Sequence, residues 1–110
     1  MGQVQAVISS IEEAQLLKNK GDKEQQYHTQ HSYAEALVFY KQAWDILPKM
    51  EQKELLYFLH HQNIKEEMWL LGLRAICLGG VIHENLSVCY FKLKQYDKTI
   101  EHAHYVLGIW

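Results

Sequence analysis

The sequence predicts an all-α protein built from antiparallel helix-pair repeats, and three observations carry this prediction. First, the 110 residues include one proline and six glycines, too few for the many turns of a sandwich or barrel. Second, apolar residues recur at steps of three and four, which is the period of an amphipathic helix. Third, one pattern of aromatic, small and aliphatic residues occurs twice. A chain of this length fits a single domain, residues 1–110.

The composition excludes several classes of function. The net charge of −2 comes from 11 basic and 13 acidic side chains, so we expect no broad cationic field for nucleic acid or an anionic membrane. The sequence contains no run of 18 apolar residues, so we expect no transmembrane helix. Its first residues do not resemble a secretory signal. We therefore expect a cytoplasmic protein. Cys77 and Cys89 lie within apolar helical patterns and are expected to be reduced core residues.

The first half of the chain predicts a pair of helices. Ser10 and Glu13 match a capping box, so a first helix is expected at about residues 11–26. A polar turn follows, and Ser32 can cap a second helix. Pro48 is expected to end that helix, because proline cannot continue the hydrogen-bond ladder. The second helix carries one apolar stripe at helical spacing, formed by Tyr33, Ala36, Leu37, Tyr40, Ala43, Trp44 and Leu47.

The region after Pro48 is harder to divide. Residues 55–59 suggest a short amphipathic helix, and the polar residues 60–63 suggest a break. An apolar helical segment then runs from Met68 to Leu78. The pair Gly79-Gly80 that follows predicts either a hinge or a weak point in a long helix, because each glycine costs about 1 kcal/mol relative to alanine.

The last part of the chain predicts a second pair of helices. The helical pattern resumes over residues 81–93, Lys94 and Gln95 form a short turn, and a final helix runs to about Leu107. The apolar stripe of this final helix is expected to be buried by residues 81–93. It consists of Tyr96, Ile100, Ala103 and Leu107.

Two segments, residues 32–48 and 95–107, resemble each other. Each places an aromatic residue after a turn, then a small or short residue three positions on, then an aliphatic residue. In the first segment, the residues that fit the second helix of a tetratricopeptide repeat, whose pattern includes A-x₃-F and a closing proline, are Ala36, Tyr40, Ala43 and Pro48. The chain therefore resembles the tetratricopeptide family, which implies an α-solenoid of stacked helix pairs.

The first helix of each predicted pair extends this resemblance. Residues 17–22 look like the family's Leu-Lys-x-Lys-Gly-Asn opening, and residues 85–90 look like its Asn-Leu-Ala-x-x-Tyr segment. Repeat one then covers about 11–48 and repeat two about 80–107, with a long helical insertion at 49–79. An insertion at this place resembles FKBP-type immunophilins and the aryl-hydrocarbon-receptor-interacting co-chaperones, in which the next helix is extended backwards.

The resemblance also implies a partner and a site. Related co-chaperone domains hold the terminal carboxylate of a heat-shock chaperone with Lys and Asn side chains, whose donors make charge-assisted hydrogen bonds. By motif match, Lys18 and Asn85 occupy two of these positions. Asp22 stands where the family commonly has Asn, and its charge would repel the carboxylate of the peptide. The family's remaining clamp cations belong to a third repeat. The implied function is binding of the chaperone's acidic C-terminal peptide.

An alternative is a scaffold that associates with itself or docks a different protein. Stacked repeats need a neighbour to cover each outer face, and residues 107–110 are apolar. In this interpretation Trp110 and Ile109 lie in the interface, and a homodimer is one form that the assembly could take.

No pattern in the chain predicts catalysis, a metal site or a cofactor. His102 and His104 are two residues apart and so point to different faces of a helix, whereas zinc needs three or four converging ligands. Neither a glycine-rich nucleophile elbow nor an orienting carboxylate accompanies Cys77. We therefore expect a binding protein that is not an enzyme.

Overall fold

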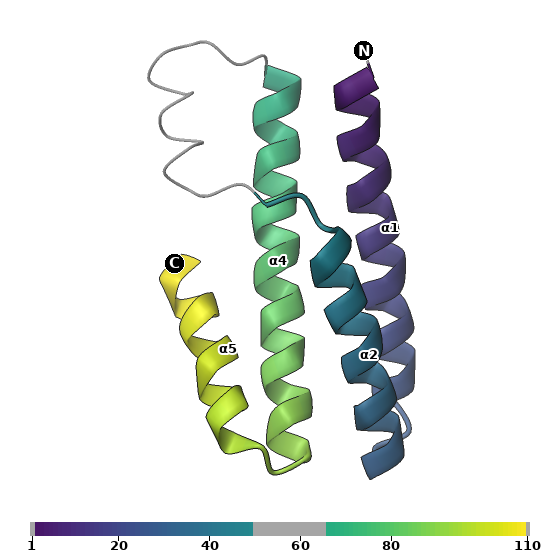
Figure 1. Ribbon diagram of the computed structural model, residues 1–110, viewed down its shortest axis with the longest axis vertical. Helices are drawn as coiled ribbons and strands as arrows, with labels where there is room; N and C mark the ends of the chain where they lie inside the picture. Colours follow the sequence, from purple (N-terminus) through teal and green to yellow (C-terminus); the bar gives the residue numbers. More distant parts are fainter. Residues whose placement is uncertain (1, 50–65, 110) are drawn as a thin grey trace.

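The predicted all-α fold class is confirmed, because every element of secondary structure that the computed structural model describes outside residues 1, 50–65 and 110 is an α-helix (Figure 1). The structure describes the backbone of residues 2–49 and 66–109 and the side chains of residues 5–49 and 68–108. The predicted short helix at 55–59 and the break at 60–63 lie outside these residues. The helices are α1 (Gly2–Gln25), α2 (Gln30–Ile46), α4 (Glu66–Lys92) and α5 (Tyr96–Ile109).

The first helix begins earlier than the capping box predicts. Helix α1 starts at Gly2, so Ser10 lies within the helix and does not cap it. The reason is tertiary packing: Val7 and Ile8 pack against the core, and Ile11 is buried within it. Burial of this apolar side outweighs the local capping signal, because most helix stability in a protein comes from packing.

The start of α2 uses a different capping residue from the one predicted. Thr29 is the N-cap, and its Oγ1 accepts a hydrogen bond from the Ser32 backbone N–H at 3.0 Å. The Ser32 side chain in turn accepts a hydrogen bond from the Thr29 backbone N–H at 2.9 Å. Ser32 is therefore the third residue of the helix in a reciprocal capping box. At the other end α2 stops at Ile46, just before Pro48, as predicted.

Helix α4 settles the alternatives at Gly79-Gly80 in favour of a long helix. It runs without interruption from Glu66 to Lys92. Gly79 has a packing role, because a Cβ atom there would lie 3.1 Å from the Trp44 ring and 3.4 Å from a methyl carbon of Leu47. The missing side chain lets α2 approach α4 closely at this point.

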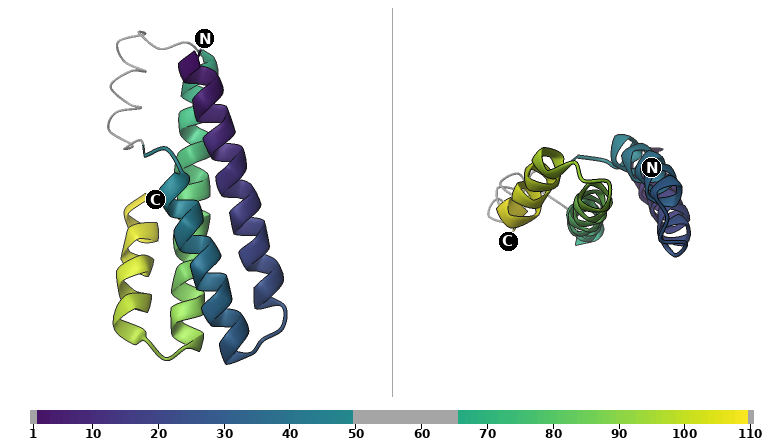
Figure 2. Two further views of the ribbon diagram at one scale, coloured as in Figure 1. Left: turned by 45° about the vertical axis from the view of Figure 1, so that its right-hand side comes forward. Right: turned by 90° about the horizontal axis from the view of Figure 1, so that it is seen from below.

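The helices form two antiparallel pairs that pack side by side. Helices α1 and α2 form one pair, α4 and α5 form the other, and α4 contacts both helices of the first pair. Figure 1 and the view from below in Figure 2 place α5 at one edge, next to α4. The turn between α4 and α5 places Lys94 in the left-handed region, with φ of 62°.

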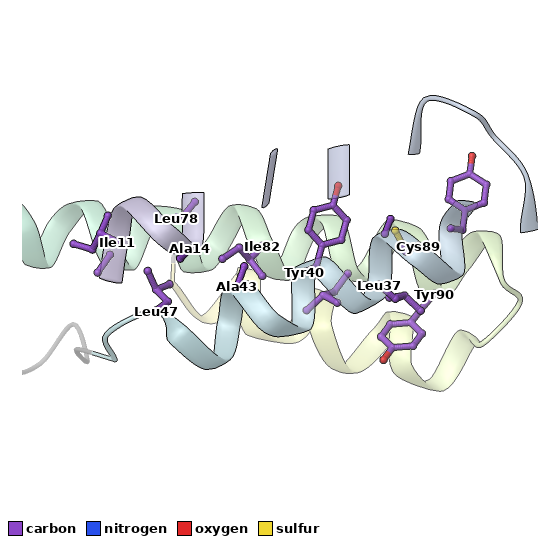
Figure 3. Packing of buried hydrophobic residues seen from close by; sticks show 14 of the residues in the cluster. Ile11, Ala14, Leu37, Tyr40, Ala43, Leu47, Leu78, Ile82, Cys89 and Tyr90 are labelled. Carbon is purple, nitrogen blue, oxygen red and sulfur yellow. The ribbon is translucent and has the colours of Figure 1, made fainter. Parts of the chain in front are cut away.

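The core lies where α4 meets the first helix pair. Figure 3 shows the side chains of α2 and α4 meeting there. Tyr40, Ile82 and Cys89 have no exposed surface. The predicted stripe of α2 is largely confirmed, since all of its residues are buried except Trp44, which is half-buried and packs against the core.

Three of the four residues in the predicted stripe of α5 are exposed and not buried against α4, and the fourth, Ala103, is half-buried. Tyr96, Ile100 and Leu107 expose 53%, 57% and 72% of their surface. The side of α5 that meets α4 is more polar. It includes His102, whose ring contacts His83, and Thr99, whose carbonyl accepts a hydrogen bond from Ser87 Oγ at 3.0 Å. The prediction followed the apolar residues, whereas the helix packs through this polar side.

Candidate functional site

The three residues suggested as a peptide clamp lie together between α1 and α4. Lys18 Nζ forms an ion pair with Asp22 Oδ2 at 2.7 Å, one helical turn along α1. Asn85 Nδ2 of α4 donates to Asp22 Oδ1 at 3.4 Å. Asp22 and Asn85 are 63 positions apart in the chain, so only the packing of α4 beside α1 brings them together.

A buried tyrosine holds the carboxylate of Asp22 from the other side. The Tyr40 hydroxyl donates to Asp22 Oδ1 at 2.6 Å and accepts from Gln25 Nε2 at 2.7 Å. Burial, and then the hydrogen bond to Asp22, raise the pKa of Tyr40 well above its usual value. The hydroxyl therefore stays protonated and remains a donor. Tyr40 packs in the core, as the sequence predicted, and also fixes the position of Asp22.

The absence of a side chain at position 21 makes this arrangement possible. A Cβ atom on Gly21 would lie 2.6 Å from Cε1 of the Tyr40 ring. Real Cβ atoms do not approach carbon atoms so closely, so the ring can lie over α1 only because residue 21 is glycine. Gly21 thus allows α2 to deliver the Tyr40 hydroxyl to the neighbouring residue, Asp22.

The carboxylate of Asp22 fills the place between Lys18 and Asn85. It accepts hydrogen bonds from Tyr40 and Asn85 and pairs with the ammonium of Lys18. This geometry shows that the donors converge on a carboxylate. It also means that Lys18 already has an anionic partner, so a peptide carboxylate would have to compete with Asp22 for it.

A groove of about 300 Å³ lies next to this cluster, between α1 and α4. We call it the α1/α4 groove. Lys18 and Arg74 supply two positive charges, one from each helix, and the other residues are mostly apolar. The groove is lined by Ile11, Gln15, Lys18, Arg74, Cys77, Leu78 and Val81. Its chemistry suits a peptide that combines acidic and apolar side chains.

Sequence reasoning missed the α4 side of this groove. Arg74 and Val81 are seven residues apart and so lie on one face of a continuous helix. The expected interruption at Gly79-Gly80 concealed that relationship. The signal that could have revealed this side of the groove is the helical spacing of residues, continued without a break through Gly79 and Gly80.

The two cysteines differ, and one of the two predictions is wrong. Cys89 is buried in the core as predicted, and burial raises the pKa of its thiol to about 12. Cys77 is exposed and lines the α1/α4 groove. The apolar neighbours of Cys77 suggested burial, but on α4 it faces α1 at a place where the two helices leave space between them.

A second cluster lies on the seam between α4 and α5 and joins two histidines. His83 Nδ1 and His102 Nδ1 are 2.8 Å apart. His83 is only 5% exposed, its ring stacks on Tyr105, and it meets Trp44 edge to face. Burial, then the charges of His102 and Lys49, lower the pKa of His83 to about 4. These rings hold α5 against α4.

The remaining sequence predictions are not decided by the structure. The side chains of Ile109 and Trp110, expected in an interface, lie outside the described residues. Among the described residues, no three His, Cys, Asp or Glu side chains are grouped as a metal site would require. None of the described helices has the length and apolar character needed to cross a membrane.

Comparisons with protein-family models, with curated proteins and with solved structures each give no match to this chain.

Proposed function

We propose that this chain is a protein-interaction module that binds the acidic C-terminal peptide of a partner in the α1/α4 groove. A peptide of the heat-shock chaperone kind, ending in Glu-Glu-Val-Asp, fits the chemistry, and the role would then be that of a cytoplasmic co-chaperone. The observation that carries the proposal is that Lys18 of α1 and Asn85 of α4 both contact the carboxylate of Asp22. The two donors are therefore already arranged around a carboxylate.

The charges of the groove support an acidic ligand. Lys18 and Arg74 stand on opposite walls, so a peptide between them can meet a cation on each side. An ammonium or guanidinium that binds a carboxylate makes a charge-assisted hydrogen bond, which is about twice as strong as a neutral one. Apolar contact with Leu78 and Val81 would hold a side chain such as valine.

Asp22 sets the strength of this binding. Its carboxylate pairs with Lys18 at 2.7 Å, and the side chain of Lys18 is only 20% exposed. A peptide carboxylate must either displace Asp22 from Lys18 or bind beside it against like-charge repulsion. We therefore expect the natural chain to bind weakly and the variant Asp22→Asn to bind more tightly, because Asn keeps an acceptor for Tyr40 but loses the charge.

The test is a calorimetric titration of the folded chain with a peptide ending in Glu-Glu-Val-Asp. Lys18→Ala should weaken binding roughly tenfold to a hundredfold, because a hydrogen bond to a charged group contributes about 1.5–3 kcal/mol. Arg74→Ala should weaken it in the same direction. Lys20→Ala is the matched control, because Lys20 is an exposed lysine of α1 outside the groove, and it should change little.

A second titration checks the ligand. The same peptide with an amidated C-terminus lacks the terminal charge and should bind more weakly to the natural chain and to Asp22→Asn. If neither protein binds the free-acid peptide at high concentration while both remain helical by circular dichroism, the proposal is wrong.

A further inference from the structure

The outer face of α5 carries a row of exposed apolar side chains. Tyr96, Ile100 and Leu107 lie on one side of the helix, and each exposes more than half of its surface. Phe91, at the end of α4, is 54% exposed and packs edge to face against Tyr96, with ring centroids 5.8 Å apart. We call these four residues the α5 stripe. A contiguous exposed patch of this kind typically marks an interaction surface.

The first helix pair shows what covers such a stripe. Ile100 and Leu107 hold the places in α5 that Leu37 and Trp44 hold in α2, counted from the aromatic residue at the start of each stripe. In α2 these places are covered by α4: Leu37 is 7% exposed, and the Trp44 ring lies against His83. The fold therefore buries this surface under a helix in one pair and leaves it exposed in the other.

We propose that the α5 stripe binds the α5 stripe of a second copy of this chain, with the two helices antiparallel. The stripe has an aromatic end, Phe91 and Tyr96, and an aliphatic end, Ile100 and Leu107. A two-fold axis through its middle brings the aromatic end of each copy onto the aliphatic end of the other. The surface is thus complementary to itself, as a two-fold interface requires.

Two polar side chains at the edge of the stripe, a carboxylate and an imidazole, favour the antiparallel arrangement. Asp97 and His104 are both exposed, and their seven-residue spacing places them on the same edge of α5 about two turns apart. In the antiparallel pair Asp97 of one copy comes level with His104 of the other, and this happens twice. A parallel pair would instead place this edge of the two copies on opposite sides of the interface, so Asp97 and His104 would not meet. The acidic group and the imidazole therefore select one orientation.

Sedimentation velocity of the full chain over a wide concentration range tests the proposal. The natural chain should sediment as a dimer at high concentration. Leu107→Glu should remain a monomer, because it places a charge within the stripe. Leu16→Glu is the matched control: Leu16 is an equally apolar residue of α1, 62% exposed and outside the stripe, so this variant should dimerise like the natural chain. All three should keep the same helical circular dichroism, since both positions are exposed.

A charge exchange tests the orientation. Asp97→Lys should weaken the dimer, and adding His104→Asp to it should restore the dimer, because Lys and Asp then face each other in the antiparallel pair.

Two results would overturn the proposal: a natural chain that stays monomeric at every concentration, or a Leu107→Glu variant that dimerises like the natural chain. Failure of the double variant to recover would overturn the antiparallel arrangement. Peptide binding in the α1/α4 groove should be the same in Leu107→Glu, so the two proposals can fail separately.

Discussion

His83 of α4 and His102 of α5 face each other with their Nδ1 atoms 2.8 Å apart. At this distance one ring donates its N–H to the other, so the accepting nitrogen must be unprotonated. Nearby charges act on the pair as well: Lys49 lowers the pKa of His83, whereas the pKa of His102 is raised by Glu101 and lowered by Lys98 and Lys41, with a net lowering. Burial is the largest cause in both rings. Both histidines therefore resist protonation in the folded protein.

The chain should lose stability in mild acid. The pKa of His83 falls from 6.5 in the unfolded chain to about 4 in the fold, so the unfolded state binds a proton first as the pH drops. The stabilisation is fully present above pH 6.5 and is lost progressively towards pH 4. At about 1.4 kcal/mol per pKa unit, His83 accounts for about 3 kcal/mol of that loss. Urea denaturation at a series of pH values measures it.

Two variants assign this acid sensitivity. His83→Phe keeps an aromatic ring against Trp44 and Tyr105 but cannot be protonated, so its stability should change less between pH 7 and pH 4. His31 lies on the surface with its side chain 85% exposed, and His31→Gln should keep the full dependence on pH. Equal slopes in His83→Phe and the natural chain would show that another group is responsible.

Two glycine substitutions in helices should have opposite effects. Gly21→Ala places a methyl group 2.6 Å from Tyr40 Cε1, and forcing a carbon atom into a packed site typically costs about 1–3 kcal/mol. Gly108→Ala meets nothing within 4 Å and should stabilise the chain by up to about 1 kcal/mol, because alanine is the better helix former. Thermal unfolding measures both. A stabilised Gly21→Ala variant would mean that Tyr40 does not lie over α1.

A larger side chain at Ala36 should also destabilise the fold. Ala36 of α2 has no exposed surface, so Ala36→Leu must displace its neighbours, at a cost of about 1–3 kcal/mol. Ala34 lies two residues away on the exposed side of α2, and Ala34→Leu should leave the melting temperature nearly unchanged. The difference between these variants isolates burial from helix propensity, which is the same for both.

Removing the hydroxyl of Tyr40 should destabilise the chain through Asp22. Tyr40→Phe keeps the buried ring but removes the donor 2.6 Å from Asp22 Oδ1. A hydrogen bond to a charged group contributes about 1.5–3 kcal/mol, so urea denaturation should show a loss of that order. Tyr27→Phe, at a tyrosine that is 70% exposed, should have no measurable effect and serves as the control.

Local signals in the sequence predicted helices well and their packing less well. Pro48 cannot extend the helix that precedes it, because its ring removes the N–H donor and clashes with the preceding turn, and α2 ends at Ile46. The start of α1 and the continuity of α4 depend on contacts with distant residues. Ile8 extends α1 by packing on the core, and Gly79 accommodates Trp44. Neither contact can be read from neighbouring residues.

The candidate site shows the same division. The motif resemblance pointed to Lys18, Asp22 and Asn85, and the structure brings these three side chains together. The sequence indicated that Asp22 would oppose an incoming carboxylate. It did not reveal that Asp22 is held by Tyr40, since that contact joins two helices 18 positions apart. Arg74 was missed because its place in the groove depends on where α4 packs beside α1.

The contrast between the two thiols makes the natural chain ready for single-site labelling. Cys89 is enclosed in the core with its pKa raised to about 12, whereas Cys77 opens into the α1/α4 groove. Since the thiolate is the reactive form, a maleimide dye should attach to Cys77 alone while the chain is folded. Its emission would then report directly on anything that enters the groove. Uptake of a second equivalent of dye would in turn mark the moment at which the core opens.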